Sequence, residues 1–372
     1  MKIWVLYFIL FLFFGSCITE FKPDVSEYEY ALVVDGRITN QKKVHSVKLS
    51  KSYNYSEAKG DAVKGAIVKV ISDNGSEELL TERNDGIYET SASFSGVVGV
   101  GYKLNISFDS KEYESSFEIM LPVNKIDSLT WEVAQDKNNV SGVQIFVHSG
   151  KTGTGIESKY YKWEFEEVWK FSAPALEPKV KSLWYCWKTI PILGYSVGSS
   201  EGLSENIIEK KEINFVSSET NRLYYRYSTM VNQYSMNRNS YLFFKQLREQ
   251  TESDNALFES TPTTYHSNIS CKTNPNELVL GYFEVSEVSS KRIFIDRLDL
   301  PETLYIPRFE LFTNDTCQFG QALLDSKIDR RLVFDTGVTF QGELRLFYYD
   351  SRKCFDCTES GFPNVPPDYW KE

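Results

Sequence analysis

The sequence predicts a mainly β protein, in which an immunoglobulin-like sandwich is followed by a larger β-sandwich domain with one helix. Aromatic residues make up 15% of the chain, with 23 Tyr and 25 Phe against 4 Met, and this bias suits sheets better than helical bundles. Turn signals recur about every eight to twelve residues in the first third of the chain, as in β-sandwiches. Residues 160–171 alternate with a period of two, which predicts a long half-buried strand.

We expect the N-terminal sandwich over residues 31–122. Its predicted strands are apolar or alternating runs at 31–38, 44–49, 66–70, 87–88, 102–108 and 113–119. Turns at Asp73-Asn74-Gly75 and Asp85-Gly86 separate several of them. The runs 65–70, 86–88 and 101–104, taken with these turns, resemble the small immunoglobulin-like modules called carboxypeptidase regulatory-like domains. Leu121-Pro122 marks the boundary, because Pro cannot continue a central strand.

The larger domain is expected over residues 123–357. In its long strand the apolar parity predicts the core face, and the other parity, which carries Lys162, Glu164, Glu166 and Lys170, predicts a solvated face. Further strands are expected at 183–188, 223–231, 332–340 and 343–349, and a hairpin at 278–285 and 292–296. One helix is predicted near 239–250, with Asn237 and Asn239 as capping candidates. The tail, 358–372, is expected to be irregular.

The first residues form an export leader. Lys2 precedes an apolar stretch from Ile3 to Phe14, which is too short for a membrane-spanning helix. The small residues Gly15-Ser16 before Cys17 resemble the lipobox of bacterial lipoproteins. The resemblance implies a signal peptide at 1–16, lipidation of Cys17, and a tether over 17–30. The chain would then meet the membrane through its lipid anchor, in an oxidising compartment.

Composition and motifs argue against several functions. A net charge of −10 disfavours nucleic-acid binding and docking on anionic lipid. His45, His148 and His266 lie in no metal-ligand spacing, and there is no Gly-x-Ser-x-Gly motif. We expect no catalytic residues, no metal and no cofactor. Glu164 and Glu166 could serve as the carboxylate pair of a glycoside hydrolase, but their alternation with lysines favours a solvated surface.

Five cysteines remain when Cys17 is assigned to the lipid, an odd number that allows up to two disulfides and one free thiol. Cys354 and Cys357 could form a redox pair, half of a zinc site or a structural disulfide element. The thioredoxin-like context and a second cysteine pair are missing, which favours the structural interpretation. One or both would then hold the C-terminal segment, to Cys317 or to Cys271.

Tryptophans gather between residues 163 and 187. Exposed aromatic rings can stack on sugars or contact a protein partner. Trp163 and Trp169 share the core parity of the long strand, whereas Trp184 and Trp187 lie on opposite parities. One of the latter two is expected to point outward, so Trp184 and Trp187 are the candidate contacts for a ligand or partner.

An ordered set of segments resembles the lipoprotein family known as domain of unknown function 4249. The segments are the lipobox and residues 33–38, 65–68, 161–165, 257–258, 268–269, 279–283, 354–358 and 367–370. The resemblance implies an outer-membrane lipoprotein, on the periplasmic or the surface side, similar to lipoproteins that accompany TonB-dependent transporters. We therefore expect a non-enzymatic binding or accessory module for such a transporter. The alternatives are a structural or adhesive surface lipoprotein and, less favoured, a hydrolase.

Overall fold

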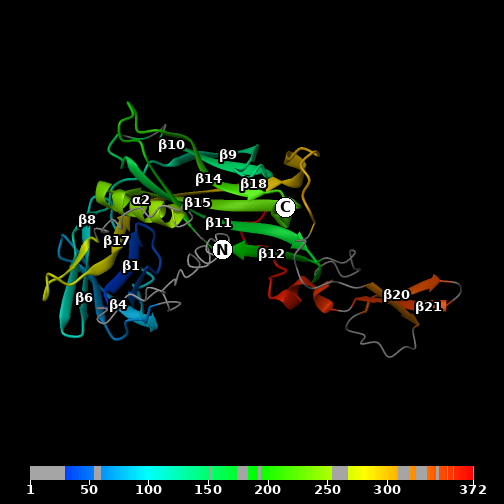
Figure 1. Cartoon of the computed structure of the whole chain (residues 1–372), viewed down its shortest axis with the longest axis horizontal. Helices are drawn as coiled ribbons and strands as arrows, with labels where there is room; N and C mark the ends of the chain where they lie inside the picture. Colours follow the sequence, from blue (N-terminus) through cyan, green and yellow to red (C-terminus); the bar gives the residue numbers. More distant parts are fainter. Residues whose placement is uncertain are drawn as a thin grey trace, which may run out of the picture.

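The computed structural model describes residues 30–53, 60–150, 153, 155–173, 183–191, 194–253, 267–308, 319–323, 333–340, 343–349, 351–354 and 356–371. The protein is mainly β and sandwich-like, as the sequence predicts. Two β units lie side by side, and a small three-stranded sheet extends from one end (Figure 1). Within the described residues, no helix is both long and apolar enough to cross a bilayer.

The N-terminal unit is a ten-stranded sheet with the order β16-β7-β6-β3-β4-β5-β2-β1-β17, in which β8 pairs with β6. Its two ends approach each other, and a single apolar core lies inside, with Val34, Leu49 and Leu104 fully buried. Its strands are β1 (Leu32–Thr39), β2 (Ser46–Lys51), β3 (Ile67–Ser72), β4 (Glu77–Asn84), β5 (Ile87–Glu89), β6 (Gly101–Phe108), β7 (Lys111–Ser115), β8 (Glu118–Ile119), β16 (Ile269–Cys271) and β17 (Val279–Ser286).

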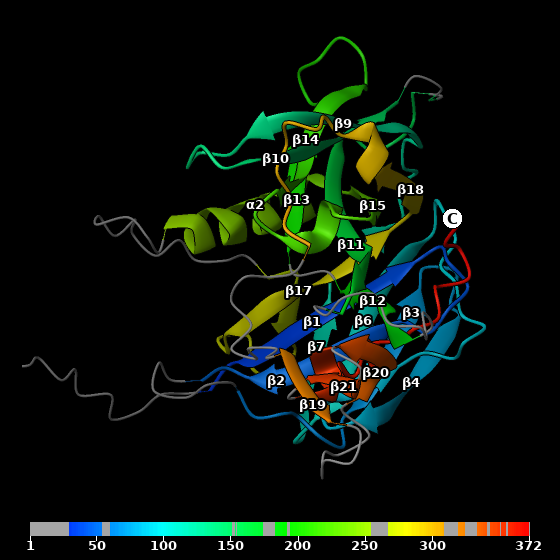
Figure 2. The ribbon, with the colours of Figure 1, turned by 90° about the vertical axis from the view of Figure 1, so that its right-hand side faces the viewer.

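The second unit is a sandwich of two sheets, β14-β10-β9 and β12-β11-β15-β18, in which β13 also pairs with β11 (Figure 2). Tyr161, Trp163 and Trp169 face its core, which confirms the predicted core parity of the long strand. Its strands are β9 (Ile126–Gln135), β10 (Ser141–Ser149), β11 (Tyr160–Ser172), β12 (Tyr185–Ile190), β13 (Tyr195–Ser199), β14 (Ile208–Ser217), β15 (Arg226–Met236) and β18 (Val288–Asp296).

Among the described residues there is one α-helix, α2 (Arg238–Ser253), which covers the outward face of β11 and β13 and confirms the helix predicted near 239–250. Asn237 begins it, because its side-chain oxygen accepts the backbone N–H of Ser240 at 2.8 Å. Short 3₁₀ helices are η2 (Asn221–Leu223), η3 (Arg297–Asp299), η5 (Arg352–Cys354) and η6 (Cys357–Ser360).

The predicted hairpin over 278–296 is wrong. β17 pairs with β1 in parallel and β18 pairs with β15, so the chain leaves the first unit and enters the second at Glu287. The Glu287 carboxylate accepts the backbone N–H of Val123 at 2.7 Å, and its own N–H donates to Ser235 Oγ at 2.9 Å. β16 and β17 therefore belong to the N-terminal sheet, although their sequence position suggested the second domain.

β17 fits beside β1 because residue 281 is a glycine. Gly281 has a φ of +95°, and a Cβ there would lie 1.9 Å from the carbonyl oxygen of Val34. Only glycine adopts this conformation while allowing so close an approach. The parallel pairing that joins residues 32–39 to residues 279–286 thus depends on this position.

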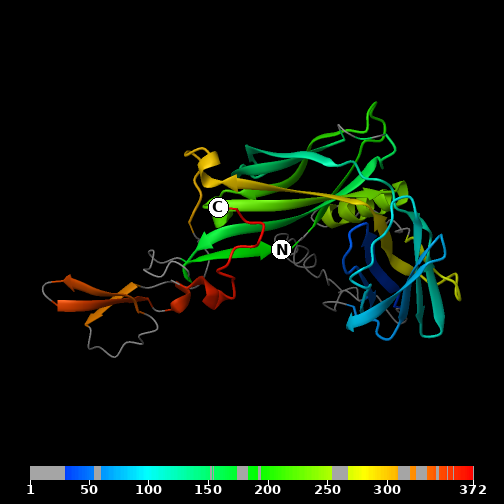
Figure 3. The same cartoon turned by 180° about the vertical axis from the view of Figure 1, so that it is seen from behind.

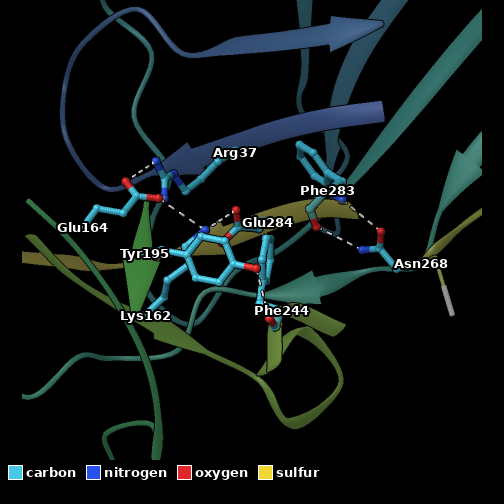
Figure 4. Close-up of polar contacts among 8 residues, drawn as sticks. All are labelled: Arg37, Lys162, Glu164, Tyr195, Phe244, Asn268, Phe283 and Glu284. Atoms are coloured by element: carbon cyan, nitrogen blue, oxygen red, sulfur yellow. Dashed lines mark hydrogen bonds and ion pairs between the residues drawn. The ribbon is translucent and has the colours of Figure 1, made fainter. Parts of the chain in front are cut away.

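A side chain completes the join between the two ends of the N-terminal sheet. The Asn268 amide donates to the carbonyl of Phe283 at 3.0 Å and accepts the N–H of Phe283 at 2.9 Å (Figure 4). The side chain thereby replaces one residue of a strand ladder between β16 and β17. Its amide also donates to the buried Glu118 carboxylate at 3.1 Å.

The C-terminal segment returns to the second unit after the small sheet of β19 (Phe319–Leu323), β20 (Val333–Phe340) and β21 (Glu343–Tyr349), ordered β19-β21-β20 (Figure 3). Cys357 forms a disulfide with Cys186 of β12 across a sequence separation of 171 residues. The carbonyl of Pro363 accepts the N–H of Trp187 at 3.0 Å, so the tail covers the free edge of β12. The tail contains little regular structure beyond η6, yet it is packed.

We expect Asn268→Ala to destabilise the N-terminal unit by about 1–3 kcal/mol, because it leaves the buried polar backbone of Phe283 without its partners. Urea unfolding followed by circular dichroism measures this free energy. Ser270→Ala, an exposed change two residues farther along in β16, serves as the control. Equal stability of the two variants would show that Asn268 does not hold the sheet ends together.

Candidate functional site

Four charged residues meet where the two units touch. β1 carries Arg37, β17 carries Glu284, and β11 carries Lys162 and Glu164 (Figure 4). Arg37 binds Glu164 through two parallel hydrogen bonds, Nη1 to Oε1 at 2.7 Å and Nη2 to Oε2 at 2.9 Å. This bidentate geometry is the strongest that an arginine and a carboxylate can form. It fixes the N-terminal sheet against the middle of the second unit.

The other pair lies deeper. Lys162 Nζ is 2.5 Å from Glu284 Oε1 and 3.5 Å from Glu164 Oε1, so the lysine links both carboxylates. The side chains of Lys162 and Glu284 are 3% and 6% exposed. Charges so deeply buried are stable only when paired, because each has lost its hydration. We refer to Arg37, Lys162, Glu164 and Glu284 as the junction cluster.

Aromatic rings surround the cations of the junction cluster. The Arg37 guanidinium lies 4.0 Å above the ring of Tyr234, and Lys162 Nζ lies 4.1 Å from the ring centroid of Phe244. Such contacts stabilise desolvated cations. Tyr195 donates its hydroxyl hydrogen to the carbonyl of Phe244 at 3.0 Å and so attaches β13 to α2. This hydrogen bond to the helix backbone fixes α2 next to the junction cluster.

Burial and charge act in opposite directions on the pKa values here. Burial tends to raise the pKa of Glu164, but the hydrogen bonds and charge of Arg37 outweigh it and hold that pKa below its usual value. Burial lowers the pKa of Lys162, although the charge of Glu284 opposes the shift. Burial also acts to lower the pKa of Arg37, and Glu284 and Glu164 more than compensate, so it is raised. The cluster is electrically neutral in its ionised form.

A cleft of about 820 Å³ opens beside the junction cluster. One wall is the outer face of β17, β1 and β2, and the other is α2 with β13. A second hollow of about 590 Å³ lies beyond Phe243 and Tyr282, which line both. It contains the buried Glu118, whose pKa burial raises despite hydrogen bonds from Asn268, Ser116 and Tyr282.

The structure corrects the solvated face predicted for β11. Lys162 and Glu164 are buried, because the N-terminal sheet and α2 cover that end of the strand. Glu166, farther along, forms an ion pair with Arg292 at 3.2 Å. An arginine therefore holds each of the two carboxylates that sequence analysis weighed as a hydrolase pair. The alternation is real, and the second face is covered at Lys162 and Glu164, whereas the Glu166 side chain remains 38% exposed and Lys170 is partly exposed.

Trp184 and Trp187 also differ from expectation, since both are buried, at 4% and 5% exposure. Trp184 packs in a cluster with Cys357 and Phe362, and Trp187 stacks edge to face with Trp370. The chain's own tail thus occupies both aromatic surfaces. These tryptophans contact an intramolecular partner, so neither is available as the expected ligand contact.

The cysteines divide differently from the sequence expectation. Cys357 pairs with Cys186, which was not among the favoured candidates, and Cys354 is also disulfide-bonded. Cys271 is a buried free thiol, so its expected disulfide is wrong. It lies in β16, at the far end of the molecule from the tail. Cys17, Cys317 and His266 lie outside the described residues.

The remaining histidines take structural positions. His45 is buried beside the cleft, with Nε2 2.9 Å from Thr39 Oγ1, and His148 pairs with Thr130 at 2.8 Å. Burial lowers the pKa of His45 to about 4, and the charges of Lys43 and Arg37 act in the same direction. Among the described residues, no group of three or more His, Cys, Asp or Glu side chains could hold a metal ion.

These features define a class: a mainly β protein of two units that share a buried ionic junction, with a disulfide-held C-terminal segment. The chain belongs to the family described as "Domain of unknown function (DUF4249)", whose model matches residues 18–292. The matched region includes the whole junction cluster.

Other comparisons show little. A solved structure of a DUF4785 family protein from Legionella pneumophila is similar at 8% sequence identity with a TM-score of 0.19. The match covers 54% of this chain and 51% of that chain, so the matched part spans about half of the Legionella protein. No curated protein matches this sequence.

We expect Glu284→Leu to destabilise the protein by about 3–5 kcal/mol, because it leaves the buried Lys162 without its closest partner. Adding Lys162→Met should restore at least half of the loss, because the Arg37–Glu164 pair stays complete. Urea unfolding of the single and double variants measures both effects. A double variant as unstable as the sum of its two single variants would contradict this account of the pair.

The low pKa of His45 predicts a pH dependence of stability. The unfolded chain binds a proton at His45 below about pH 6.5 and the folded protein only near pH 4, so the free energy of unfolding should fall across this interval. Between pH 7 and pH 4.5, His45→Gln should remove about 2–3 kcal/mol of that decrease. Chemical unfolding at both pH values tests this, with His148→Gln as control. An unchanged slope in His45→Gln would refute the assignment.

Proposed function

We propose that this protein is a non-enzymatic, lipid-anchored protein of the outer membrane that serves as a binding or accessory module for a TonB-dependent transporter. The anchor is the acylated Cys17 behind its leader. The folded body is the two-unit scaffold joined by the junction cluster, and it carries an open cleft of small-molecule size.

The disulfide between Cys186 and Cys357 carries this proposal. Such bonds form and persist in exported proteins, whereas cytosolic thiols are kept reduced. A second disulfide at Cys354 points the same way. The Cys186–Cys357 bond holds the tail on β12, where the tail covers Trp184 and Trp187. This supports export, which is the first requirement of the lipoprotein hypothesis.

The accessory role is supported by the family and by the rigidity of the scaffold. The family model matches most of the chain, and the resemblance drawn from the sequence relates this family to lipoproteins that accompany transporters. A module that presents a ligand to a transporter must keep its binding surfaces in fixed relation. The shared strand β17 and the bidentate Arg37–Glu164 pair provide that constraint.

Metabolic labelling with an alkyne fatty acid tests the anchor. We expect label on the native chain, none on Cys17→Ser, and full label on the control Cys271→Ser, because only Cys17 follows the leader. Crosslinking in intact cells, followed by mass spectrometry, tests the partner, and a TonB-dependent β-barrel should be recovered with the native chain. An unlabelled native chain would overturn the proposal. A labelled chain without any such barrel would favour the structural or adhesive alternative.

A further inference from the structure

We propose that the cleft beside the junction cluster binds a small organic carboxylate, one whose single anionic group is attached to an apolar body. This inference goes beyond the proposed function and does not depend on the lipid anchor. It follows from the shape of the cleft, the apolar character of its walls and the distribution of charge along it.

The cleft has the size and the construction of a ligand site. Its volume of about 820 Å³ lies within the usual range for small-molecule sites. The mouth is open, since Val44, Ser46 and Lys48 are exposed. Its base is closed by the buried side chains of Lys162 and Glu284. A ligand can therefore enter without any rearrangement of the junction.

Both walls carry apolar side chains. On the sheet side, Val33 lies in register with Leu280, and both line the cleft. On the helix side, α2 contributes Phe243, Phe244 and Leu247. Between these walls an aliphatic chain or an aromatic ring would lose its contact with water on both sides. Burial of this kind contributes roughly 25 cal/mol per Å² of apolar surface.

The charges along the cleft do not balance. The four members of the junction cluster cancel in pairs. His45 is neutral at pH 7, because its pKa is about 4. The remaining charges are one negative, Asp35, and two positive, Lys43 and Lys48. The cleft therefore has one positive charge in excess.

The positive charges of Lys43 and Lys48 are the source of this excess. Within the described part of the chain, neither Lys43 nor Lys48 takes part in an ion pair, although Asp35 lies in register with Lys48 on the neighbouring strand. Desolvation lowers the pKa of Lys43, the charge of Arg37 lowers it further, and the charge of Glu164 opposes the shift. A bound carboxylate would add a negative charge near this amine and so stabilise its charged form.

The positive charge of this cleft differs from the charge of the rest of the protein. Its net charge of −10 repels anions at a distance, so a positive mouth is a local feature of this cleft. The neighbouring hollow is lined by Glu118, Glu114 and Lys272, and because Lys272 pairs with Glu114 at 3.5 Å, the excess charge there is the negative one of Glu118. A monoanion with an apolar body therefore suits the junction cleft better than the hollow beyond Phe243.

Three probes with one body separate charge from hydrophobic contact: 4-phenylbutyrate, 4-phenylbutan-1-ol and 4-phenylbutylamine. Saturation-transfer NMR titrations would use the full chain in lipid nanodiscs, with empty nanodiscs subtracted. We expect the carboxylate to bind about three- to tenfold more tightly than the alcohol, as one or two exposed charge contacts allow, and the amine to bind most weakly.

Variants locate the binding. In the double variant Lys43→Gln with Lys48→Gln, the affinity for the carboxylate should fall to that for the alcohol. The affinity for the alcohol should not change. Lys137→Gln with Lys371→Gln makes the same charge change on exposed lysines outside the cleft and should have no effect. Ser46→Trp, on an exposed strand position, should fill the mouth and abolish binding of all three probes. Its thermal unfolding curve confirms that it still folds.

The proposal is overturned if the carboxylate binds no more tightly than the alcohol, or if none of the probes binds. It is also overturned if the control lysine pair matters as much as Lys43 and Lys48. Binding that persists in Ser46→Trp would place the probe in another hollow and likewise reject the cleft. These outcomes are independent of fatty-acid labelling at Cys17, so the two proposals can fail separately.

Discussion

The junction cluster is the interaction on which the rest of this structure depends. Two charges of each sign lie between the units, where Arg37 binds Glu164 through both terminal nitrogens, Nη1 and Nη2, and Lys162 binds Glu284. Buried ion pairs add little stability compared with apolar packing, but a buried charge without its partner is costly. The cluster therefore serves mainly to fix the position of β1 and β17 relative to β11. The observed placement of β1 and β17 against β11 pairs all four charges.

The path of the chain reinforces that placement. β17 completes the N-terminal sheet and leads directly through Glu287 into β18 of the second unit. Asn268 joins the sheet ends, and Tyr195 attaches β13 to α2. At the opposite end the tail covers β12 through a disulfide and Trp370. The cleft lies between α2 and the outer face of the N-terminal sheet, and the junction cluster forms its base.

Local patterns are enough to predict much of the fold. Alternation identifies β11 and its core face, and the capping residue Asn237 marks the start of α2. The partners of each strand are not predictable, since the pairing of β1 with β17 joins residues about 250 apart and leaves no local signal. This is why residues 278–296 resemble a hairpin in the sequence. In the same way, the parity of Trp184 and Trp187 does not reveal that the tail covers β12.

The site is less visible in the sequence than the fold. Lys162 and Glu164 resemble a solvated face, because alternation shows that two faces differ and does not show what covers the second face. One signal is present: Glu284 is the single charge of the otherwise apolar segment 279–286, and Arg37 lies in the mostly apolar segment 32–39 with one other charge, Asp35. Charges at such positions are rarely buried unless they are paired. Such positions can be recognised in the sequence as charges that need a partner, but the sequence does not show which opposite charge that partner is.

Native-state hydrogen exchange on the unmodified protein tests the central claim most directly. If the junction cluster makes the two units one cooperative body, the slowest amides of β1, β17 and β11 should exchange with the same free energy of opening. Their denaturant dependence should also merge into a single curve. The account is contradicted if β1 and β17 exchange through a lower-energy opening that leaves β11 fully protected.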